Sequence, residues 1–360
     1  MSKSIIYITP SFRLIALRFV LIFFSTLFCS SLAFSQKNCL QELEKDENLY
    51  AEGKLKDIPL ILSQCIKKGF DKEQKTRAYE LIILSYLYLD NELLAAENML
   101  ALLRFEKEYD LTGREPAEFK KLYNSFRTYP IFMIGVNLGG NFSFASPGEL
   151  YGVGILSKDS INYNTNLGIK IGISSDFQIG KHILLSQEIN IQNINYTYSN
   201  RLFDFTQYEF RESQTILSLP IGMKILAGGK KFLPFISMGI GFDILLRSNL
   251  QITRTFPERP IVDVTGQDVD ITNLRNQNNY HFYFGTGFKW KVPRSFFFFE
   301  ARFASSRLNQ VNVNRRYSNT ELIYRYGHID NDFLLNHLNF SVGLQYNFYK
   351  PKLLRKYFYN

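Results

Sequence analysis

Histidine and carboxylate side chains are the residues of this chain that are best suited to metal binding or acid–base catalysis. The chain has 4 histidines. One of them opens the run His328-Ile329-Asp330-Asn331-Asp332. A histidine with two carboxylates offers either metal ligands or the acid–base groups of a surface protease. The simpler interpretation is a solvated polar loop. A second acidic pair, which such a protease needs, is not evident, so the sequence predicts no enzyme, no metal site and no cofactor.

Charged residues also recur inside stretches that otherwise alternate between apolar and small polar residues. They fall on the polar side of the alternation, and their sign changes from one stretch to the next. A buried charge without a partner is very costly, so we expect these residues to form an internal salt-bridge network. The alternative is a gated pore or a proton route. The predicted network consists of Lys170, Glu188, Lys224, Asp243, Lys289, Glu300 and Arg302.

The stretches that carry these charges follow one another from Pro130 to the C-terminal end. Their period of two is typical of strands with one apolar face. A change of phase between Ile191 and Ile194 in the third stretch suggests a β-bulge. The eight predicted strands cover residues 132–144, 167–179, 183–198, 217–225, 236–246, 280–290, 297–303 and 338–348.

The connections between these strands alternate in length. Three are short, and four are long and polar, covering roughly 145–162, 199–212, 248–278 and 309–333. Short turns on one side, long loops on the other and an even strand count are typical of an outer-membrane β-barrel. The lumen of such a barrel with eight strands is only wide enough for side chains, so the charges would plug it.

The last strand carries a more specific signal. Ser341-x-Gly343-x-x-Tyr346-x-Phe348 resembles the motif by which the outer-membrane assembly machinery recognises its client barrels. Many clients end at the aromatic residue, whereas this chain continues with a basic tail, 350–360.

Two further segments, LSLPIGMK at 217–224 and PFI at 234–236, extend the similarity. With them, residues 130–349 resemble the PorT-type outer-membrane barrels of Bacteroidota, which are OmpX/OmpA-like barrels with eight strands. The resemblance implies a fold and a location. Some members of this broad group serve the type IX secretion system, and nothing in the sequence singles out that role.

The N-terminal part of the chain has an export signal followed by a helical pattern. Lys3, Arg13 and Arg18 precede an apolar run and the small-residue site Ala33-Phe34-Ser35, which predicts a signal peptide over residues 1–35. Residues 36–128 then show the helical period. Two hairpins about 37 residues apart are similar to tetratricopeptide repeats, which usually bind a protein in a groove. The alternative is a structural bundle with no partner.

Two cysteines, Cys39 and Cys65, remain after removal of the signal peptide. An exported protein can keep a disulfide. The two residues are placed symmetrically about the turn near Gly53, so they face each other in an antiparallel helical hairpin. We therefore expect a Cys39–Cys65 disulfide, and the alternative is a pair of buried free thiols.

The sequence as a whole predicts an α+β protein with two domains. A periplasmic all-α domain (36–128) precedes an outer-membrane barrel with eight antiparallel strands (129–349) and a basic periplasmic tail (350–360), and the long loops are extracellular. The formal net charge is +9, but no Lys/Arg run has the spacing of a nucleic-acid site, so nucleic acid is not an expected partner. The expected partners are outer-membrane lipid with lipopolysaccharide, the barrel assembly machinery and a periplasmic or outer-membrane protein.

The favoured function is that of a non-enzymatic barrel. Its helical domain would dock a protein partner in an envelope assembly or secretion complex. The alternatives are a surface-binding or adhesin barrel that acts through its long loops, and a narrow channel.

Overall fold

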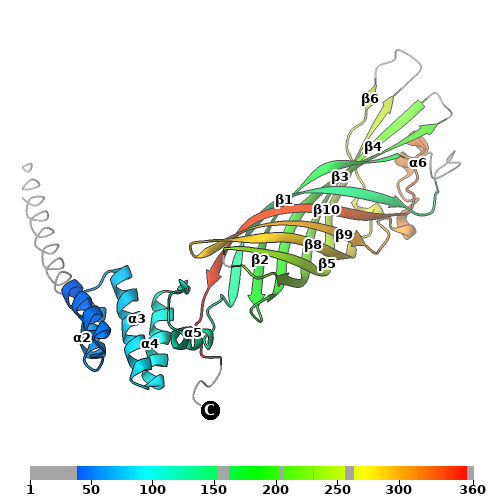
Figure 1. Ribbon diagram of the computed structural model, residues 1–360. Coiled ribbons are helices and arrows are strands. Elements are labelled where there is room, and N and C mark those ends of the chain that lie inside the picture. Colours follow the sequence, from blue (N-terminus) through cyan, green and yellow to red (C-terminus); the bar gives the residue numbers. More distant parts are fainter. Residues whose placement is uncertain (1–38, 152–161, 203–205, 230, 256–262, 355–360) are drawn as a thin grey trace, which may run out of the picture. The chain divides into compact units, whose positions relative to one another are not determined.

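The computed structural model describes residues 39–151, 162–202, 206–229, 231–255 and 263–354. The chain divides into two compact units, which we call the helical unit and the barrel unit (Figure 1). The barrel unit is Tyr129–Tyr349, and the helical unit combines the residues before it with the tail that begins at Lys350. The expected signal peptide, 1–35, lies outside the described residues, as does the end of the tail.

The helices of the helical unit start and stop at recognisable signals. Asp71 and Gln74 form a capping box, in which each side chain accepts a hydrogen bond from the other residue's backbone N–H. Asn91 caps the next helix, and Asp90 before it has a φ of 60°, which makes a tight turn. Within the described residues, no helix has both the length and the apolar character needed to cross a membrane. The helices are residues 39–51, α2 (Ile58–Lys68), α3 (Lys72–Tyr88), α4 (Glu92–Phe105) and α5 (Ala117–Asn124).

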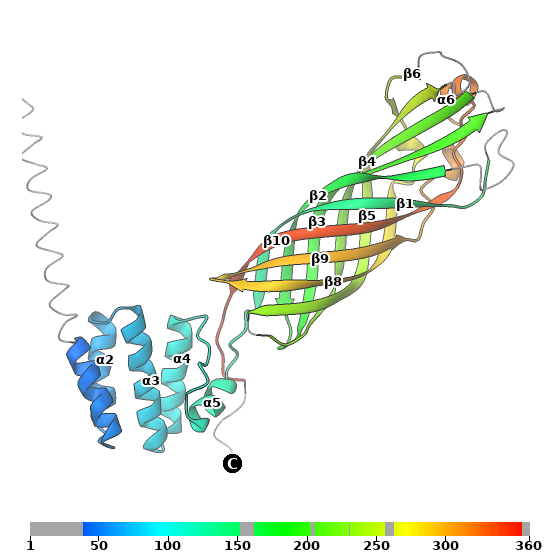
Figure 2. The ribbon, with the colours of Figure 1, turned by 45° about the horizontal axis from the view of Figure 1, so that its top comes forward.

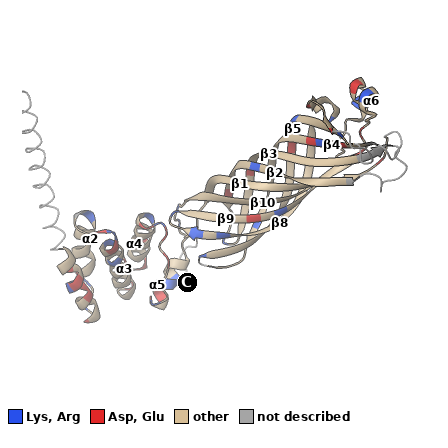
Figure 3. Ribbon diagram, turned by 90° about the horizontal axis from the view of Figure 1, so that it is seen from above, with Lys and Arg blue, Asp and Glu red and all other residues tan. Residues whose placement is uncertain are grey.

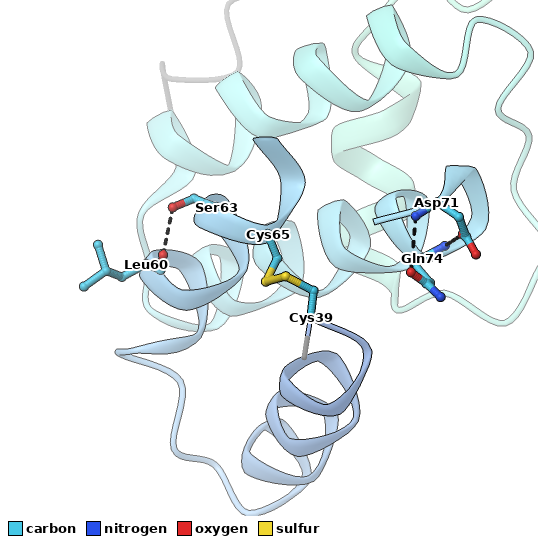
Figure 4. Close-up of a disulfide and its surroundings, with 6 residues drawn as sticks. All are labelled: Cys39, Leu60, Ser63, Cys65, Asp71 and Gln74. Atoms are coloured by element: carbon cyan, nitrogen blue, oxygen red, sulfur yellow. Dashed lines mark hydrogen bonds between the residues drawn. A yellow bond between two sulfur atoms is a disulfide. The ribbon is translucent and has the colours of Figure 1, made fainter. Parts of the chain in front are cut away.

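Apolar side chains between these helices form two buried clusters. Leu43 and Ile82 belong to the first cluster, whereas Met99 and Phe119 belong to the second. α2, α3 and α4 lie side by side (Figure 2). The predicted disulfide is present and joins Cys39 to Cys65, with the two Cα atoms 5.6 Å apart (Figure 4).

The tail after the barrel unit folds against the end of the helical unit. Phe126 and Leu353 form an antiparallel bridge, and Leu353 packs against the second buried cluster. Backbone hydrogen bonds of 2.8 and 2.9 Å join the segments 125–127 and 352–354 on either side of the bridge. The described part of the tail is therefore a component of the helical unit.

The barrel unit is a sheet of antiparallel strands that closes on itself. The order along the sheet is β4-β3-β2-β1-β10-β9-β8-β5, and β4 also pairs with β5, which completes the ring. β1 and β10 form the seam between the first and the last strand of the ring. The eight long strands are β1 (Phe132–Pro147), β2 (Asn162–Gln178), β3 (Ile183–Leu202), β4 (Thr206–Leu226), β5 (Phe232–Thr255), β8 (Asn278–Val292), β9 (Ser295–Ser306) and β10 (Phe333–Phe348).

The connections mostly follow the predicted alternation, with two differences. The first residues of the loop expected over 248–278 belong to β5, which continues to Thr255. The expected long loop over 199–212 is wrong, because β3 and β4 continue as a hairpin with paired residues from Ser199 and Glu209 up to Leu202 and Thr206. Two short strands, β6 (Val264–Thr265) and β7 (Val269–Asp270), add to β5 in the next long connection. The connection before β10 contains the helix α6 (Thr320–Tyr326).

Strands β3, β4 and β5 exchange their apolar and polar faces part-way along. In β3, Ile189 and Ile191 point outward and are exposed, whereas Ile194 and Tyr196 point inward and are buried. The direction of the side chains does not change, because the even-numbered residues 184–198 are all buried. The predicted bulge in β3 is therefore wrong. The change of phase marks the place where the apolar side of the strand moves from the outside of the ring to the inside.

The irregularities in strand pairing lie in the β2–β3 and β4–β5 pairs. Between β2 and β3 the extra residue is on β2, in the step from Asn166 to Lys170. Between β4 and β5 it is Leu246, since Thr215 pairs with Arg247 while Ile216 pairs with Leu245. Leu246 and Arg247 consequently both face outward, and β5 changes there from an apolar to a polar outer face.

Candidate functional site

Six of the seven predicted charged residues meet inside the barrel unit. Arg302 donates hydrogen bonds to Glu188 at 2.8 Å and to Glu300 at 2.9 Å. The ammonium of Lys224 lies 3.5 Å from Glu300 and 3.9 Å from Glu188. Lys170 lies 3.9 Å from Glu188. These contacts join strands β2, β3, β4 and β9 across the lumen, and Figure 3 shows charged residues of both signs on the barrel strands.

Asp176 on β2 belongs to the same network, although the sequence analysis did not identify it. Its carboxylate pairs with Lys289 at 2.5 Å and lies 3.6 Å from Lys224. The alternation that placed Lys170 and Gly172 inward also places position 176 inward, so parity along the strand was the signal that could have found it.

Asp243 is the predicted charge that lies apart from this network. Its carboxylate contacts Nδ1 of His281 at 2.7 Å. His337, on another strand, contacts the Ser143 hydroxyl at 2.9 Å. With Asp243 included, four Lys and Arg side chains face four carboxylates, so the formal charges of these eight residues cancel. The eight charges are those of Lys170, Lys224, Lys289, Arg302, Asp176, Glu188, Glu300 and Asp243.

Apolar side chains close the lumen on both sides of the charged network. The turn-side seal, as we call it, packs inward-facing residues next to the short turns. The loop-side seal packs inward-facing residues of the long strands against residues of the last long connection. The turn-side seal consists of Met133, Leu184, Leu226, Phe235 and Phe296. The loop-side seal consists of Ile194, Tyr196, Ile216, Leu245, Val311, Phe333 and Leu335.

A folded cap covers the loop side of the barrel unit. It consists of the ends of β3, β4 and β5 together with residues 263–277 and 307–332. Arg275 lies at its centre and pairs with Glu212 at 2.7 Å and with Asp330 at 2.8 Å. Around this ion pair, Tyr198 and Phe210 stack with ring centroids 4.6 Å apart. The cap therefore has a buried core of its own.

The expectation of a solvated loop around His328 is wrong, because His328 and Asp330 are buried. His328 contacts the Tyr198 hydroxyl and lies 3.3 Å from Asp330. Burial alone would raise the pKa of Asp330, but Arg275 and His328 lower that pKa to well below its usual range. Arg275 thus holds Asp330 ionised. Among the residues that the structure describes, no cluster of three or more His, Cys, Asp or Glu side chains is placed to hold a metal ion.

The residues of the expected assembly signal lie on both faces of β10. Ser341 is buried and faces the lumen, and Gly343 has the same parity. Tyr346 and Phe348 point outward and are about half exposed. The outer face of the barrel unit is apolar around its whole circumference below the cap. Representative exposed side chains on it are Val136, Ile169, Ile189, Ile221, Ile240, Phe284, Phe303 and Leu344.

Comparison with known proteins agrees with this geometry. Residues 126–306 match the model of a family described as the outer membrane protein beta-barrel domain. The chain belongs to this family. Membership indicates an outer-membrane location for the barrel unit. A search of curated proteins finds no match.

Solved structures of outer-membrane proteins are similar to the chain at low sequence identity. Neisserial surface protein A is 11% identical, covers 60% of this chain and 97% of its own, and has a TM-score of 0.28. OprG from Pseudomonas aeruginosa is 9% identical, with coverages of 62% and 97% and a TM-score of 0.34. Ail, the attachment invasion locus protein of Yersinia pestis, is 10% identical, with coverages of 60% and 98% and a TM-score of 0.24.

Proposed function

We propose that this protein is a sealed, non-enzymatic outer-membrane barrel whose helical unit lies in the periplasm and docks a protein partner. The two seals support the first part, because each places a cluster of buried apolar side chains inside the lumen, on either side of the charged network. The short turns support the second part. The even number of long strands puts both ends of the barrel unit on the side of the short turns, and in outer-membrane barrels that side is periplasmic. We also propose that the barrel unit is of the PorT type found in Bacteroidota. The helical unit would bind its partner in the manner of tetratricopeptide repeats, within an envelope assembly or secretion complex.

The observation that carries the docking proposal is an apolar patch at one edge of the helical unit. Tyr88 and Leu93 flank the turn between α3 and α4 and are 63% and 57% exposed. Leu89 in the same turn is also exposed, and the Tyr88 ring contacts that of Tyr50. Large apolar side chains gathered at a surface commonly mark a protein contact. We call this surface the turn patch.

Acidic residues surround the turn patch. Asp90 and Glu92 lie in the same turn, and Glu52 follows the first helix two positions after Tyr50. A partner surface with apolar residues surrounded by Lys or Arg would complement both features. A hollow of about 440 Å³ lies at the other end of α3, between its first turns and residue 106. It is less suited to docking, because its cations are already paired, Lys72 with Glu106 and Arg77 with Glu47.

Two further contacts of the barrel unit form part of the proposal. The apolar outer face would lie in lipid, with lipopolysaccharide in the outer leaflet. The last strand, with Ser341, Gly343, Tyr346 and Phe348, would be the segment that the barrel assembly machinery recognises.

Site-directed photo-crosslinking in intact cells tests the docking proposal. A photo-reactive residue at Leu93 should give a discrete adduct with one protein. The same residue at Lys107, which is exposed at the end of α4 away from the turn patch, should not. The substitution Leu93→Glu should remove co-purification of that protein while leaving the barrel folded. Equal adducts from both positions, or none from Leu93, would contradict docking through the turn patch.

Surface binding through the cap is the second candidate function, and one observation favours it. Tyr324 on α6 is 86% exposed, and Tyr317 before it is 58% exposed. Exposed tyrosines are common at recognition surfaces because they combine a large apolar area with a polar tip. If the cap binds a surface polysaccharide, Tyr324→Ala should weaken binding of purified protein to that polysaccharide, whereas Leu93→Glu should not.

A further inference from the structure

The two segments that join in the helical unit flank the barrel unit in the sequence. Segment 125–127 lies shortly before β1, and segment 352–354 lies shortly after β10. β1 and β10 form the seam that closes the ring, with paired residues from Phe132 and Phe348 to Pro147 and Phe333. The helical unit therefore holds together the two segments that lead into the strands of this seam.

The contact between these segments combines several independent interactions. The N–H of Leu354 donates to the carbonyl of Ser125 at 2.8 Å, and the N–H of Arg127 donates to the carbonyl of Lys352 at 2.9 Å. The guanidinium of Arg127 donates to the carbonyl of Lys350 at 2.8 and 3.3 Å.

The side chain of Leu353 adds an apolar anchor to these hydrogen bonds. It packs against the cluster of Met99 and Phe119, in the core of the helical unit. The tail is thus held through its backbone and through one side chain.

We propose that the helical unit acts as a clamp on the barrel seam, a role separate from docking a partner. Pairing two strands from the ends of a chain of this length is opposed by the entropy of closing a long loop. A folded unit that already holds segments 125–127 and 352–354 together removes much of that entropic cost. It therefore speeds the pairing of β1 with β10 and opposes its opening.

The neighbouring residues Leu353 and Leu354 offer a matched pair of substitutions. Leu353 is partly buried and packs against the helical core, whereas Leu354 is 54% exposed. The test compares refolding of the purified full chain into detergent micelles, followed by the heat-modifiable shift of the folded barrel on gels. Leu353→Asp should slow the appearance of folded barrel by about tenfold, the size expected for losing the burial of one leucine. Leu354→Asp should refold at the rate of the unmodified chain.

A covalent replacement of the clamp keeps the test decisive if Leu353→Asp folds poorly. Arg127 and Lys352 are opposite one another in a hydrogen-bonded antiparallel pair, a spacing that suits a disulfide. Arg127→Cys with Lys352→Cys, oxidised in the Leu353→Asp background, should restore the fast rate, and reduction should remove the gain. Wild-type protein with and without reductant controls for loss of the Cys39–Cys65 disulfide.

Two results would overturn the clamp. One is a Leu353→Asp barrel that refolds as fast as the unmodified chain. The other is an oxidised double-cysteine variant that still refolds slowly. Because the purified chain is measured without a partner, neither result bears on docking through the turn patch, and loss of docking would leave the clamp unaffected.

Discussion

Asp46 shows how a single residue limits the stability of the helical unit. Its side chain is fully buried, and neither carboxylate oxygen has a hydrogen-bond partner among the described residues. Burial and the nearby Glu42 raise the pKa of Asp46 to about 6, and Lys45 only partly opposes them. The unfolded chain releases this proton near pH 4. The free energy of unfolding should therefore fall as the pH rises from about 4 to about 6 and stay lower above that range.

We predict that Asp46→Asn stabilises the helical unit at neutral pH by an amount on the order of 1 kcal/mol, because it removes an unpaired buried charge. Urea unfolding followed by circular dichroism at a helix-sensitive wavelength measures the change, at pH 5 and at pH 8. The gain should be larger at pH 8. Asp57→Asn is the control, because Asp57 is exposed and should give no such pH-dependent gain. An equal gain at both pH values would contradict the argument.

Gly343 has a structural role that is separate from any role in recognition by the assembly machinery. A Cβ atom added at this position would lie 2.4 Å from the Phe298 ring and 2.5 Å from the Val136 carbonyl oxygen. The glycine is therefore needed for the close approach of the Phe298 side chain inside the lumen. Gly222 and Gly239 make room for the Tyr283 hydroxyl in the same way.

We predict that Gly343→Ala lowers the free energy of unfolding of the refolded barrel by about 1–3 kcal/mol, the usual cost of overpacking a core. The measurement uses purified protein in micelles, where no assembly machinery is present. Adding Phe298→Leu should recover part of the loss. If Gly343→Ala were as stable as the unmodified barrel and failed only in cells, the glycine would serve recognition alone.

At the scale of elements, the alternation of residues predicted the strands well but not their environment. The strand period depends only on the backbone, so the eight long strands were recognised from positions such as Phe132 and Phe348. The apolar pattern depends on what each face of a strand packs against, and on β3, β4 and β5 this environment changes along the strand. The exchange of faces near Ile191 and Ile194 was therefore mistaken for a bulge. The same exchange made the polar outer residues of the β3–β4 hairpin resemble a loop.

The candidate site shows the same limit. Inward charges such as Lys224 and Glu188 could be found from parity within a strand, as could the missed Asp176. Which charges meet could not be found, because that depends on the pairing and stagger of eight strands. The buried cluster of Arg275, Glu212 and Asp330 was also not predicted, since two of its members come from long connections without a period. Cys39 and Cys65 were paired correctly because a helical hairpin fixes their distance locally.

Under the proposed outer-membrane function, the exchange of faces marks the edge of the lipid on β3, β4 and β5. On β4 the outward residue Leu217 should contact lipid, whereas the outward residue Ser213 should contact water. We predict that an environment-sensitive fluorophore at Leu217→Cys emits at a shorter wavelength in lipid vesicles than one at Ser213→Cys. Nitroxide-labelled lipid should quench only the first. Equal quenching at the two positions would place the β3–β4 hairpin inside the membrane.

At the scale of the whole molecule, the barrel unit is closed by three successive layers. The turn-side seal lies at one end, the charged network occupies the middle, and the loop-side seal and the cap close the other end. In an eight-stranded barrel the lumen holds side chains rather than a column of water. Ions would therefore meet apolar side chains at both ends, and charged side chains between them that are already paired with one another.

We predict that purified protein gives no stable conductance in planar lipid bilayers. Opening one seal should not change this result, because the other seal remains. Phe235→Ala with Phe296→Ala, which empties much of the turn-side seal, should therefore stay silent while lowering stability. Adding Tyr196→Ala and Phe333→Ala removes large side chains from the loop-side seal, and only this combination should give brief current steps. Large and stable currents from the unmodified chain would show that the lumen opens, and would favour a channel over a docking protein.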